Sequence, residues 1–351
     1  MKILSVIDTF THGGAESVAV NLILGMPQHS HMLLHSSGFF NVEPSAYLIA
    51  RLKEGHIAVK DFDYSCFRKS EILNEILKTF SPDIVMYHWW GNDPLSTWRE
   101  AVRADGLHKP KFICVVHSIK PNKLVQPGYD FYATVSFAAG GHQRHIPSEK
   151  TRIIYNGIDV KKFDVAIRRE DNGKFVIGRV SALNPKKIPA DWIKIANTFN
   201  INGASFVIAG DGPLKDILIA DVEKLGVQHK FLLPGYVNQY DLPSLLGTFS
   251  ICCYITTTCE ANSLALIECA VAGLPIVAQP RGGIPEQVVH GKTGFLSEDI
   301  NGIKYYCGLL ARDASLRKEM SAKARQFGRR FSIERQCQAY DKLFKELIYC
   351  G

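Results

Sequence analysis

The sequence predicts an α/β protein made of two doubly wound parallel sheets. Its 351 residues correspond to about two domains of ordinary size. Short runs rich in β-branched residues alternate with amphipathic stretches, which is typical of parallel strands joined by helices. Because this alternation starts again halfway along the chain, we expect two Rossmann-like domains in sequence.

The first half contains five predicted strands separated by helical stretches. The strands are Ile3–Ile7, Met32–His35, Ile84–Tyr87, Phe112–His117 and Tyr132–Ser136. The intervening helices include Glu16–Leu24 and Ser70–Phe80. This order predicts a sheet that begins at the N-terminus, so MKILSVID is a first strand and not a signal peptide.

The second half repeats the pattern. Its predicted strands are Phe175–Val180, Ser205–Ala209, Phe231–Leu233, Ile251–Ile255 and Pro275–Ala278. Helices again intervene, such as Asp191–Phe199 and Ser263–Ala272.

The two series meet at IIYNGID, residues 153–159, where Asn-Gly is turn chemistry. We therefore expect one domain over residues 1–157 and a second over 158–331. From Ser332 onward a further helix is predicted, with apolar positions at Ala339, Leu343, Phe344 and Leu347.

Composition and charge exclude several classes of protein. Hydrophobic residues make up 46% and charged residues 21% of the chain, which excludes disordered and fibrous proteins. The net charge of +7 weakly favours anionic partners, but no dense Lys/Arg tract indicates nucleic acid.

The longest apolar stretch is interrupted by Glu268 and Pro275 and is too short to cross a bilayer. Nine scattered cysteines without a CxxC motif suggest reduced thiols rather than zinc ligands. We expect a cytoplasmic protein, soluble or peripheral at the inner face of the membrane.

The segment at residues 259–286, CEANSLALIECAVAGLPIVAQPRGGIPE, carries the strongest chemical signal. Asn262 and Ser263 are good helix N-caps, and the apolar run after them is stopped by Gly273. Free N–H groups and the helix dipole at this start make an anion site. Glu260 lies just before that site and Glu268 within the helix, so the two carboxylates could hold hydroxyls on either side of a diphosphate. The alternative is a buried helix with two incidental glutamates, although an unpaired buried carboxylate is costly.

The spacing of these glutamates resembles the E-x7-E signature of retaining glycosyltransferases with the GT-B fold, in glycosyltransferase family 4. Further segments along the chain are similar to that family in order and spacing: THGGAE (11–16), VVHS (115–118), YNGID (155–159), IGRVSALNPKK (177–187), VIAGDGP (207–213), LLPGYV (232–237), and GGIPE with HGKTGFL (282–296). The resemblance covers nearly the whole chain. It implies two Rossmann-like domains that face a cleft, with the C-terminal helix crossing back so that residues 332–351 join the first domain. The first domain would take the acceptor and the second would bind the nucleotide-sugar donor.

The resemblance also assigns roles in the donor site. Glu260 would contact hydroxyls of the donor sugar, and Glu268 would bind the nucleotide ribose. The backbone amides of Asn262, Ser263 and Leu264 would line the sugar and diphosphate pocket, and the backbone of Tyr236 and Val237 would read the base.

Arg179 and the two lysines that follow it are candidates for a diphosphate clamp. A guanidinium fork and a nearby ammonium could together neutralise a leaving diphosphate. The loop is longer than is usual in the family, so both Lys186 and Lys187 remain open, and we favour Lys187. Three solvated surface cations are the alternative.

The remaining candidates lie in the first domain. Gly13 and Gly14 form a tight turn that lets backbone approach a ligand, and this turn is not the GxGxxG of nicotinamide enzymes. The resemblance implies that both glycines contact the donor, that Glu16 lies near the acceptor, and that His117 lies near the sugar. His88 and Trp89 end a strand and could contact an acceptor sugar, although core packing is equally consistent with the sequence.

Asp61 and Asp63 match the Asp-x-Asp pattern that binds a metal diphosphate in the other glycosyltransferase fold. They follow HIAVK in a strand-to-loop context, far in sequence from the diphosphate elements. Two aspartates alone make a poor metal site. We interpret them as surface residues and expect no required metal or other cofactor.

The resemblance therefore implies a retaining hexosyltransferase, and we expect it to be metal-independent. It would move a sugar, with glucose as the expected one, from a UDP-sugar to a hydroxyl of a glycan or lipid-linked acceptor in polysaccharide or glycoconjugate synthesis. One alternative is a nucleotide-sugar epimerase of the same architecture, which would need additional acid/base carboxylates. The other is a non-catalytic nucleotide-sugar binding protein.

Overall fold

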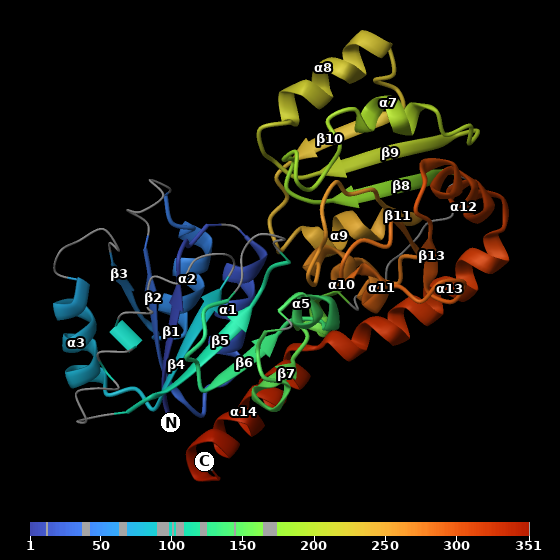
Figure 1. Ribbon diagram of the computed structural model, residues 1–351. Coiled ribbons are helices and arrows are strands. Elements are labelled where there is room, and N and C mark those ends of the chain that lie inside the picture. Colours follow the sequence, from blue (N-terminus) through green and yellow to red (C-terminus); the bar gives the residue numbers. More distant parts are fainter. Residues whose placement is uncertain are drawn as a thin grey trace. The chain divides into compact units, whose positions relative to one another are not determined.

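The computed structural model describes residues 1–11, 13–36, 43–62, 69–89, 98–99, 102, 109–119, 125–143, 145–163 and 174–350. The chain divides into two compact units. Unit 1 comprises Met1–Ile158 and Ile333–Gly351, and unit 2 comprises Asp159–Ser332. Each unit is a parallel sheet with helices packed around it (Figure 1), so the predicted α/β class is confirmed.

Unit 1 contains a sheet of seven strands in the order β3-β2-β1-β4-β5-β6-β7. In chain order they are β1 (Lys2–Ile7), β2 (Ser30–His35), β3 (Ala58–Asp61), β4 (Ile84–Trp89), β5 (Lys111–Val116), β6 (Phe131–Thr134) and β7 (Thr151–Ile153). The helices are α1 (Gly14–Leu24), α2 (Ala46–Glu54), α3 (Lys69–Phe80), α5 (Phe137–His142) and α14 (Ile333–Tyr349).

Unit 2 contains a sheet of six strands in the order β10-β9-β8-β11-β12-β13. The strands are β8 (Phe175–Val180), β9 (Ala204–Ala209), β10 (Phe231–Gly235), β11 (Ile251–Tyr254), β12 (Ile276–Ala278) and β13 (Gly294–Leu296). The helices are α6 (Val160–Phe163), α7 (Trp192–Asn197), α8 (Lys215–Leu225), α9 (Leu242–Gly247), α10 (Leu264–Val271), α11 (Ile284–Gln287), α12 (Ile300–Arg312) and α13 (Ala314–Gly328).

The central strands are apolar along their length because both faces of the sheet are covered. In β1, Leu4 and Val6 belong to one hydrophobic cluster of unit 1, whereas Ile7 belongs to another. Successive side chains of a strand point to opposite faces, so these two clusters lie on the two sides of the sheet. Such double burial is typical of parallel sheets.

The last helix, α14, is part of unit 1. Tyr340, Leu343 and Phe344 on this helix are fully buried. Polar contacts add to this packing: Asp341 accepts from His29 at 2.9 Å, and Glu346 pairs with Arg152 at 2.8 Å. No helix in the described part of the chain is both long and apolar enough to cross a membrane.

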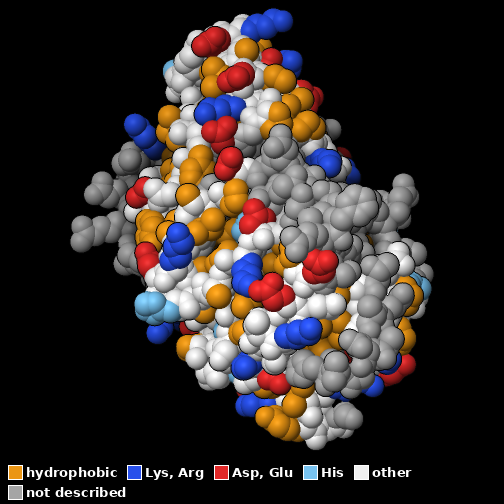
Figure 2. Space-filling model, turned by 90° about the vertical axis from the view of Figure 1, so that its left-hand side faces the viewer, with side chains coloured by type: hydrophobic (Ala, Val, Ile, Leu, Met, Phe, Trp, Pro, Cys, Tyr) orange, Lys and Arg blue, Asp and Glu red, His pale blue; other side chains and the backbone are white. Residues whose placement is uncertain are grey.

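The surface charge is mixed. On the face shown in Figure 2, Lys/Arg and Asp/Glu side chains are interspersed among apolar ones wherever the residues are described. The excess of basic residues is therefore not gathered into one patch on this face.

Candidate functional site

The segment that carries Glu260 and Glu268 lies beyond the carboxyl end of β11 in unit 2. The backbone of Glu260 pairs with Gly282, and its carbonyl accepts from the N–H of Gly283 at 2.6 Å. Gly282 has φ +63°, and a Cβ there would lie 2.3 Å from the Glu260 carbonyl oxygen. Glycine is thus required for the two loops to meet, and their contact fixes the backbone that presents Glu260.

Glu260 is buried, and both of its carboxylate oxygens are hydrogen-bonded. Oε2 lies 2.6 Å from the ammonium of Lys187, and Oε1 accepts from the hydroxyl of Tyr254 at 3.0 Å. The side chain of Lys187 is 39% exposed, whereas that of Glu260 is 5% exposed. Of the two candidate lysines, Lys187 is therefore the one that reaches the predicted sugar-binding carboxylate.

Arg179 is fully buried, so it is not a solvated surface cation. Its guanidinium donates to the carbonyls of Ile255 at 2.8 Å and Lys187 at 2.5 Å, and to the hydroxyl of Ser181 at 3.1 Å. These contacts use three of the five N–H donors of an arginine. Arg179 thus holds the loop that carries Lys187, and its direct contact with a diphosphate stays a prediction.

The loop of Lys187 is also held from the other side. Thr257 donates to the carbonyl of Pro185 and Thr258 to that of Lys186, both at 2.6 Å. Two loops from β8 and β11 are therefore tied together beside Glu260.

The predicted anion site at the start of α10 is only partly available. Ser263 is the N-cap of the helix, but its N–H donates to the Oε1 of Gln287 at 3.0 Å, and Gln287 donates back to its carbonyl at 2.8 Å. A phosphate at this helix start would depend on other donors, because the Ser263 amide is already satisfied. Asn262 is also buried.

Glu268 lies inside α10 and is buried. Its Oε1 accepts from the amide of Gln239 at 3.2 Å. Burial raises the pKa of Glu268 to about 7, and the Gln239 hydrogen bond and the charge of Lys162 oppose this rise. Glu268 therefore keeps its proton to a higher pH than an exposed glutamate does.

The sequence did not indicate Gln239, Lys162, Tyr254 or Gln287 as site residues. The ammonium of Lys162 lies 5.0 Å from the ring centroid of Tyr240. They lie in separate elements, Gln239 in a turn, Lys162 in α6, Tyr254 in β11 and Gln287 in α11, and they share no motif that could have indicated them.

The predicted base-binding residues follow the end of β10. Gly235 has φ +78°, and its carbonyl accepts from the N–H of Gly210 at 2.8 Å. Beyond it Tyr236 is 50% exposed and Val237 is half-buried. Recognition of a base by their backbone stays a prediction.

In unit 1 the expected Gly13–Gly14 turn is not formed: Gly13 is the extended N-cap of α1, and Gly14 is the first residue of the helix. A Cβ at Gly13 would lie 2.2 Å from Oε2 of Glu16, so the missing side chain makes room for that carboxylate. Glu16 is buried and accepts from the hydroxyls of Thr9 at 2.9 Å and Thr11 at 3.1 Å. Burial raises the pKa of Glu16, and these hydrogen bonds oppose the rise. The close approach that Gly13 permits is therefore used by Glu16.

His88 and His117 meet at the carboxyl ends of β4 and β5. Their rings are stacked with centroids 5.2 Å apart, and Nδ1 of His88 lies 3.0 Å from Nε2 of His117. Burial lowers the pKa of His88 to about 4; burial together with His88 lowers the pKa of His117 well below its usual value. Both rings are neutral near pH 7. His117 is half-buried, and its contact with a donor sugar stays a prediction.

The expectation that His88 and Trp89 contact an acceptor sugar needs correction. His88 is fully buried and reaches outward only through His117. Trp89 is 1% exposed and packs in a hydrophobic cluster of unit 1. Strand β4 is covered on both faces, so core packing is the role that the structure gives Trp89.

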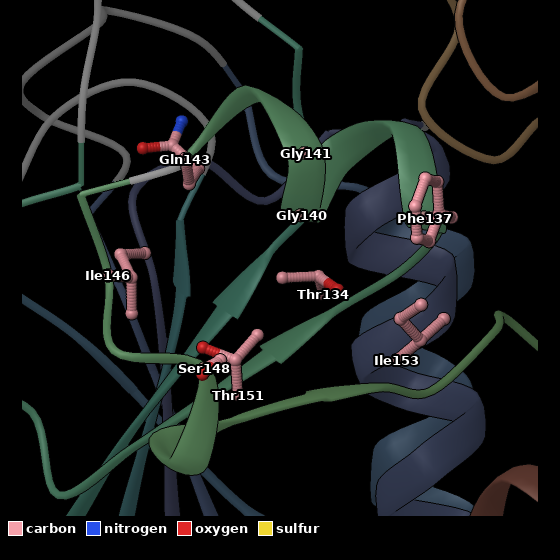
Figure 3. Close-up of a pocket in the computed structure, with 9 residues that line it drawn as sticks. All are labelled: Thr134, Phe137, Gly140, Gly141, Gln143, Ile146, Ser148, Thr151 and Ile153. Carbon is pink, nitrogen blue, oxygen red and sulfur yellow. The ribbon is translucent and has the colours of Figure 1, made fainter.

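A pocket of about 360 Å³ lies beside α5 at the edge of the unit 1 sheet. Figure 3 shows Thr134 of β6 among the lining residues, below Gly140 and Gly141 of α5. Phe137 and Ile153 line the same pocket and are 69% and 37% exposed. No motif in the sequence indicated this pocket.

Asp61 ends β3 with an exposed carboxylate, 3.6 Å from the Nδ1 of His35. Asp63 lies outside the described residues. Among the residues that the structure describes, no group of three or more His, Cys, Asp or Glu side chains could hold a metal. Eight cysteines lie in the described part, and all of them are free thiols.

Comparisons with known proteins agree with this architecture. Residues 160–327, which fall within unit 2, match the family model of glycosyl transferases group 1. The chain is 24% identical over 218 residues to N-acetyl-alpha-D-glucosaminyl L-malate synthase of Bacillus anthracis, covering 59% of this chain and 56% of that protein. It is 28% identical over 172 residues to the glycosyltransferase MJ1607 of Methanocaldococcus jannaschii, covering 46% and 42%. The chain therefore matches these curated relatives over about half of their length.

Solved structures match over nearly the full chain. Anabaena Alr3699/HepE, solved in complex with UDP and glucose, superposes with a TM-score of 0.81 at 20% identity, covering 99% of this chain and 100% of that one. A glycosyltransferase from Rickettsia africae gives a TM-score of 0.84 at 17% identity, covering 100% and 99%. The fold is the GT-B fold of glycosyltransferases, and the matches together support a transferase.

Proposed function

We propose that this protein is a retaining glycosyltransferase of family 4 that moves a hexosyl unit from a UDP-sugar to an acceptor hydroxyl. The observation that carries the proposal is the buried Glu260, bonded to Lys187, at the head of the helix that contains Glu268. A buried carboxylate paired with a half-exposed lysine provides an acceptor for sugar hydroxyls and a cation for phosphate in one place. Unit 2 is then the donor-binding domain, and unit 1 takes the acceptor.

The proposed reaction needs no protein nucleophile. The acceptor hydroxyl attacks the anomeric carbon on the face that the nucleoside diphosphate leaves, the glycosidic phosphate bond breaks, and a phosphate oxygen takes the hydroxyl proton. The protein supplies position and charge: Lys187 stabilises the leaving diphosphate, and Glu260 lies near a ring that gains positive charge. Arg179 supports the Lys187 loop and supplies additional positive charge.

Uridine is the proposed nucleoside, and glucose the proposed sugar. Alr3699/HepE was solved with UDP and with UDP-glucose, which supports this choice. Gly14 and His117 are proposed to contact the donor, and Glu16 to lie near the acceptor. The acceptor is proposed to be a glycan or a lipid-linked sugar, met in the cytoplasm or at the inner membrane face.

Two other functions are less well supported. An epimerase is not favoured, because the relatives named above are synthases and glycosyltransferases. A non-catalytic binding protein would retain the site without turnover. Incubation with UDP-glucose, followed by assay of UDP and free sugar, separates them: a transferase releases UDP with an acceptor, an epimerase changes the donor without one, and a binding protein does neither.

Substitutions of Glu260 and Glu268 test the roles proposed for these residues, because the two variants should lose different properties. Glu268→Gln should weaken UDP binding by roughly tenfold or more and raise the donor KM, because ribose contacts persist through the reaction. Glu260→Gln should mainly lower kcat and leave UDP affinity nearly intact, because a carboxylate near the sugar is worth most in the transition state. Isothermal titration with UDP and steady-state kinetics measure both effects.

Each substitution is a control for the other, since Glu and Gln have similar size and helix propensity. If Glu260→Gln loses UDP binding while Glu268→Gln keeps it, the two carboxylates have been given the wrong roles. Stronger stabilisation by GDP or ADP than by UDP in a thermal-shift panel would contradict the choice of nucleoside.

A further inference from the structure

Tyr254, the last residue of β11, contacts the Glu260 carboxylate from inside the protein. The tyrosine is 2% exposed, and its hydroxyl donates to Oε1 of Glu260 at 3.0 Å. The other oxygen, Oε2, faces Lys187 at 2.6 Å. The carboxylate is therefore held by one donor from the core and by one from a loop.

The core donor is itself fixed. The guanidinium carbon of Arg179 lies 4.3 Å from the centroid of the Tyr254 ring, and Arg179 is fully buried. A desolvated cation over an aromatic face is a strong contact, and it draws electron density from the ring. Burial and the neighbouring Glu260 also raise the pKa of Tyr254, so its hydroxyl keeps its proton. Tyr254 is thus a permanent donor to Glu260.

The loop donor differs in this respect. Lys187 has a side chain that is 39% exposed, and an ammonium on a four-carbon stem has several accessible positions. A diphosphate arriving at the loop would compete with Glu260 for this ammonium, because a phosphate carries more negative charge. The contact at Oε2 can therefore be exchanged, whereas the contact at Oε1 cannot.

We propose that Tyr254 is a positioning residue that anchors Glu260 by Oε1, so that donor binding can take Lys187 away from Oε2 and free that oxygen for a sugar hydroxyl without moving the carboxylate. Without the anchor, Glu260 follows Lys187 or loses its orientation toward the sugar. This inference rests on the proposed function, since it presumes that Glu260 and Lys187 hold a nucleotide sugar.

Tyr254→Phe tests the anchor, because it removes only the hydroxyl and keeps the ring beneath Arg179. A lost hydrogen bond to a charged group corresponds to a fall in kcat of about 10- to 150-fold. The dissociation constant for UDP should change by less than about twofold, because UDP lacks the donor hexose that Glu260 is proposed to orient. A kcat within twofold of the wild type in a folded variant would overturn the proposal, as would an equal loss of UDP binding and kcat.

Tyr340→Phe is the matched control. Tyr340 is another fully buried tyrosine, in unit 1, and its hydroxyl has no hydrogen-bond partner in the described structure. The substitution should leave kcat and UDP affinity unchanged. If Tyr340→Phe lowers kcat as much as Tyr254→Phe does, the effect is general loosening and the anchor is wrong.

Thermal unfolding without substrate tests the contact of Tyr254 with Glu260 independently of the proposed glycosyltransferase activity. Lys187→Met removes the other donor, and the thermal unfolding of Tyr254→Phe, Lys187→Met and the double variant forms a cycle. If both donors hold one carboxylate, the double variant should lose more in Tm than the sum of the single losses, since Glu260 is then buried without either donor. Additive losses would overturn the anchor even if the protein transfers sugar. A wild-type protein that binds no UDP would overturn the proposed function, while the cycle still decides whether Tyr254 and Lys187 share Glu260.

Discussion

Single residues in unit 2 show how burial sets the chemistry of the site. Glu260 is ion-paired, whereas Glu268 has an amide, Gln239, as its direct partner. The folded protein therefore holds a proton on Glu268 between its ordinary pKa of 4.5 and its raised pKa of about 7, where the unfolded chain has lost that proton. Because the folded state binds more protons in this window, the free energy of unfolding falls as pH rises through it.

Glu268→Gln should therefore stabilise the ligand-free protein at pH 8 and have little effect near pH 4.5. The gain should be at most about 3 kcal/mol, since one unit of pKa corresponds to about 1.4 kcal/mol. Denaturant unfolding of both proteins at a series of pH values measures it. A difference that is constant with pH would show that the Glu268 pKa is not raised.

Some residues of the candidate site could be predicted from the sequence, and others could not. Glu260 and Glu268 could be singled out because their spacing around a capped helix is local. Tyr254 and Gln239 could not, because their contacts depend on how strand and loop ends meet in the folded sheet. Arg179 was predicted to be a site residue, but its burial and its bonds to carbonyls are tertiary properties that the sequence does not contain.

The strands predicted from the sequence agree best with the structure at the centre of each sheet. Central strands such as β1 and β8 are mostly apolar and were predicted almost to the residue. Strands β7 and β13 were not among the predicted strands; each has three residues and lies at the edge of its sheet. Edge strands pair on one side only and need less apolar sequence, so hydrophobic pattern detects them poorly.

The hydroxyl of Thr134 in strand β6, next to the edge strand β7, allows the stability cost of a buried unpaired polar group to be tested. Thr134 is fully buried, and its hydroxyl has no hydrogen-bond partner in the described structure. Replacing it with the isosteric valine removes a buried unpaired polar group, so Thr134→Val should raise the free energy of unfolding by about 1 kcal/mol. Denaturant titration measures the change.

Thr151→Val on neighbouring β7 is the control, because it lines the same pocket and its hydroxyl donates to the carbonyl of Pro147 at 2.9 Å. That substitution should lower stability by about 0.5–1.5 kcal/mol. Destabilisation by Thr134→Val would instead mean that its hydroxyl does find a partner.

The whole molecule consists of two units with separate cores. The core of unit 1 includes the C-terminal helix, as the buried Leu343 shows, whereas unit 2 is one continuous segment with its own cluster that includes Leu310. The division into two sheets was evident from the sequence because the strand–helix pattern starts again after residue 158.

Leu343→Ala and Leu310→Ala should therefore weaken different halves of the protein. Each removes a fully buried leucine and should cost about 2–5 kcal/mol. Hydrogen exchange read by peptide mass spectrometry should show lost protection in residues 1–158 and 333–350 for Leu343→Ala, and in 159–332 for Leu310→Ala. Equal loss throughout both units for either variant would show that they unfold as one.

The chain leaves unit 1 after Ile158 and returns to it at Ile333, and these two residues lie next to each other. The N–H of Ile333 donates to the carbonyl of Ile158 at 2.9 Å, so the outgoing and returning backbones are hydrogen-bonded to each other. Unit 2 is thus an insertion whose two ends meet at one point. A different 159–332 segment with ends equally close could be grafted there without altering the spacing within unit 1. Because both ends of unit 2 lie at one place in unit 1, unit 2 could be exchanged as a whole for another domain.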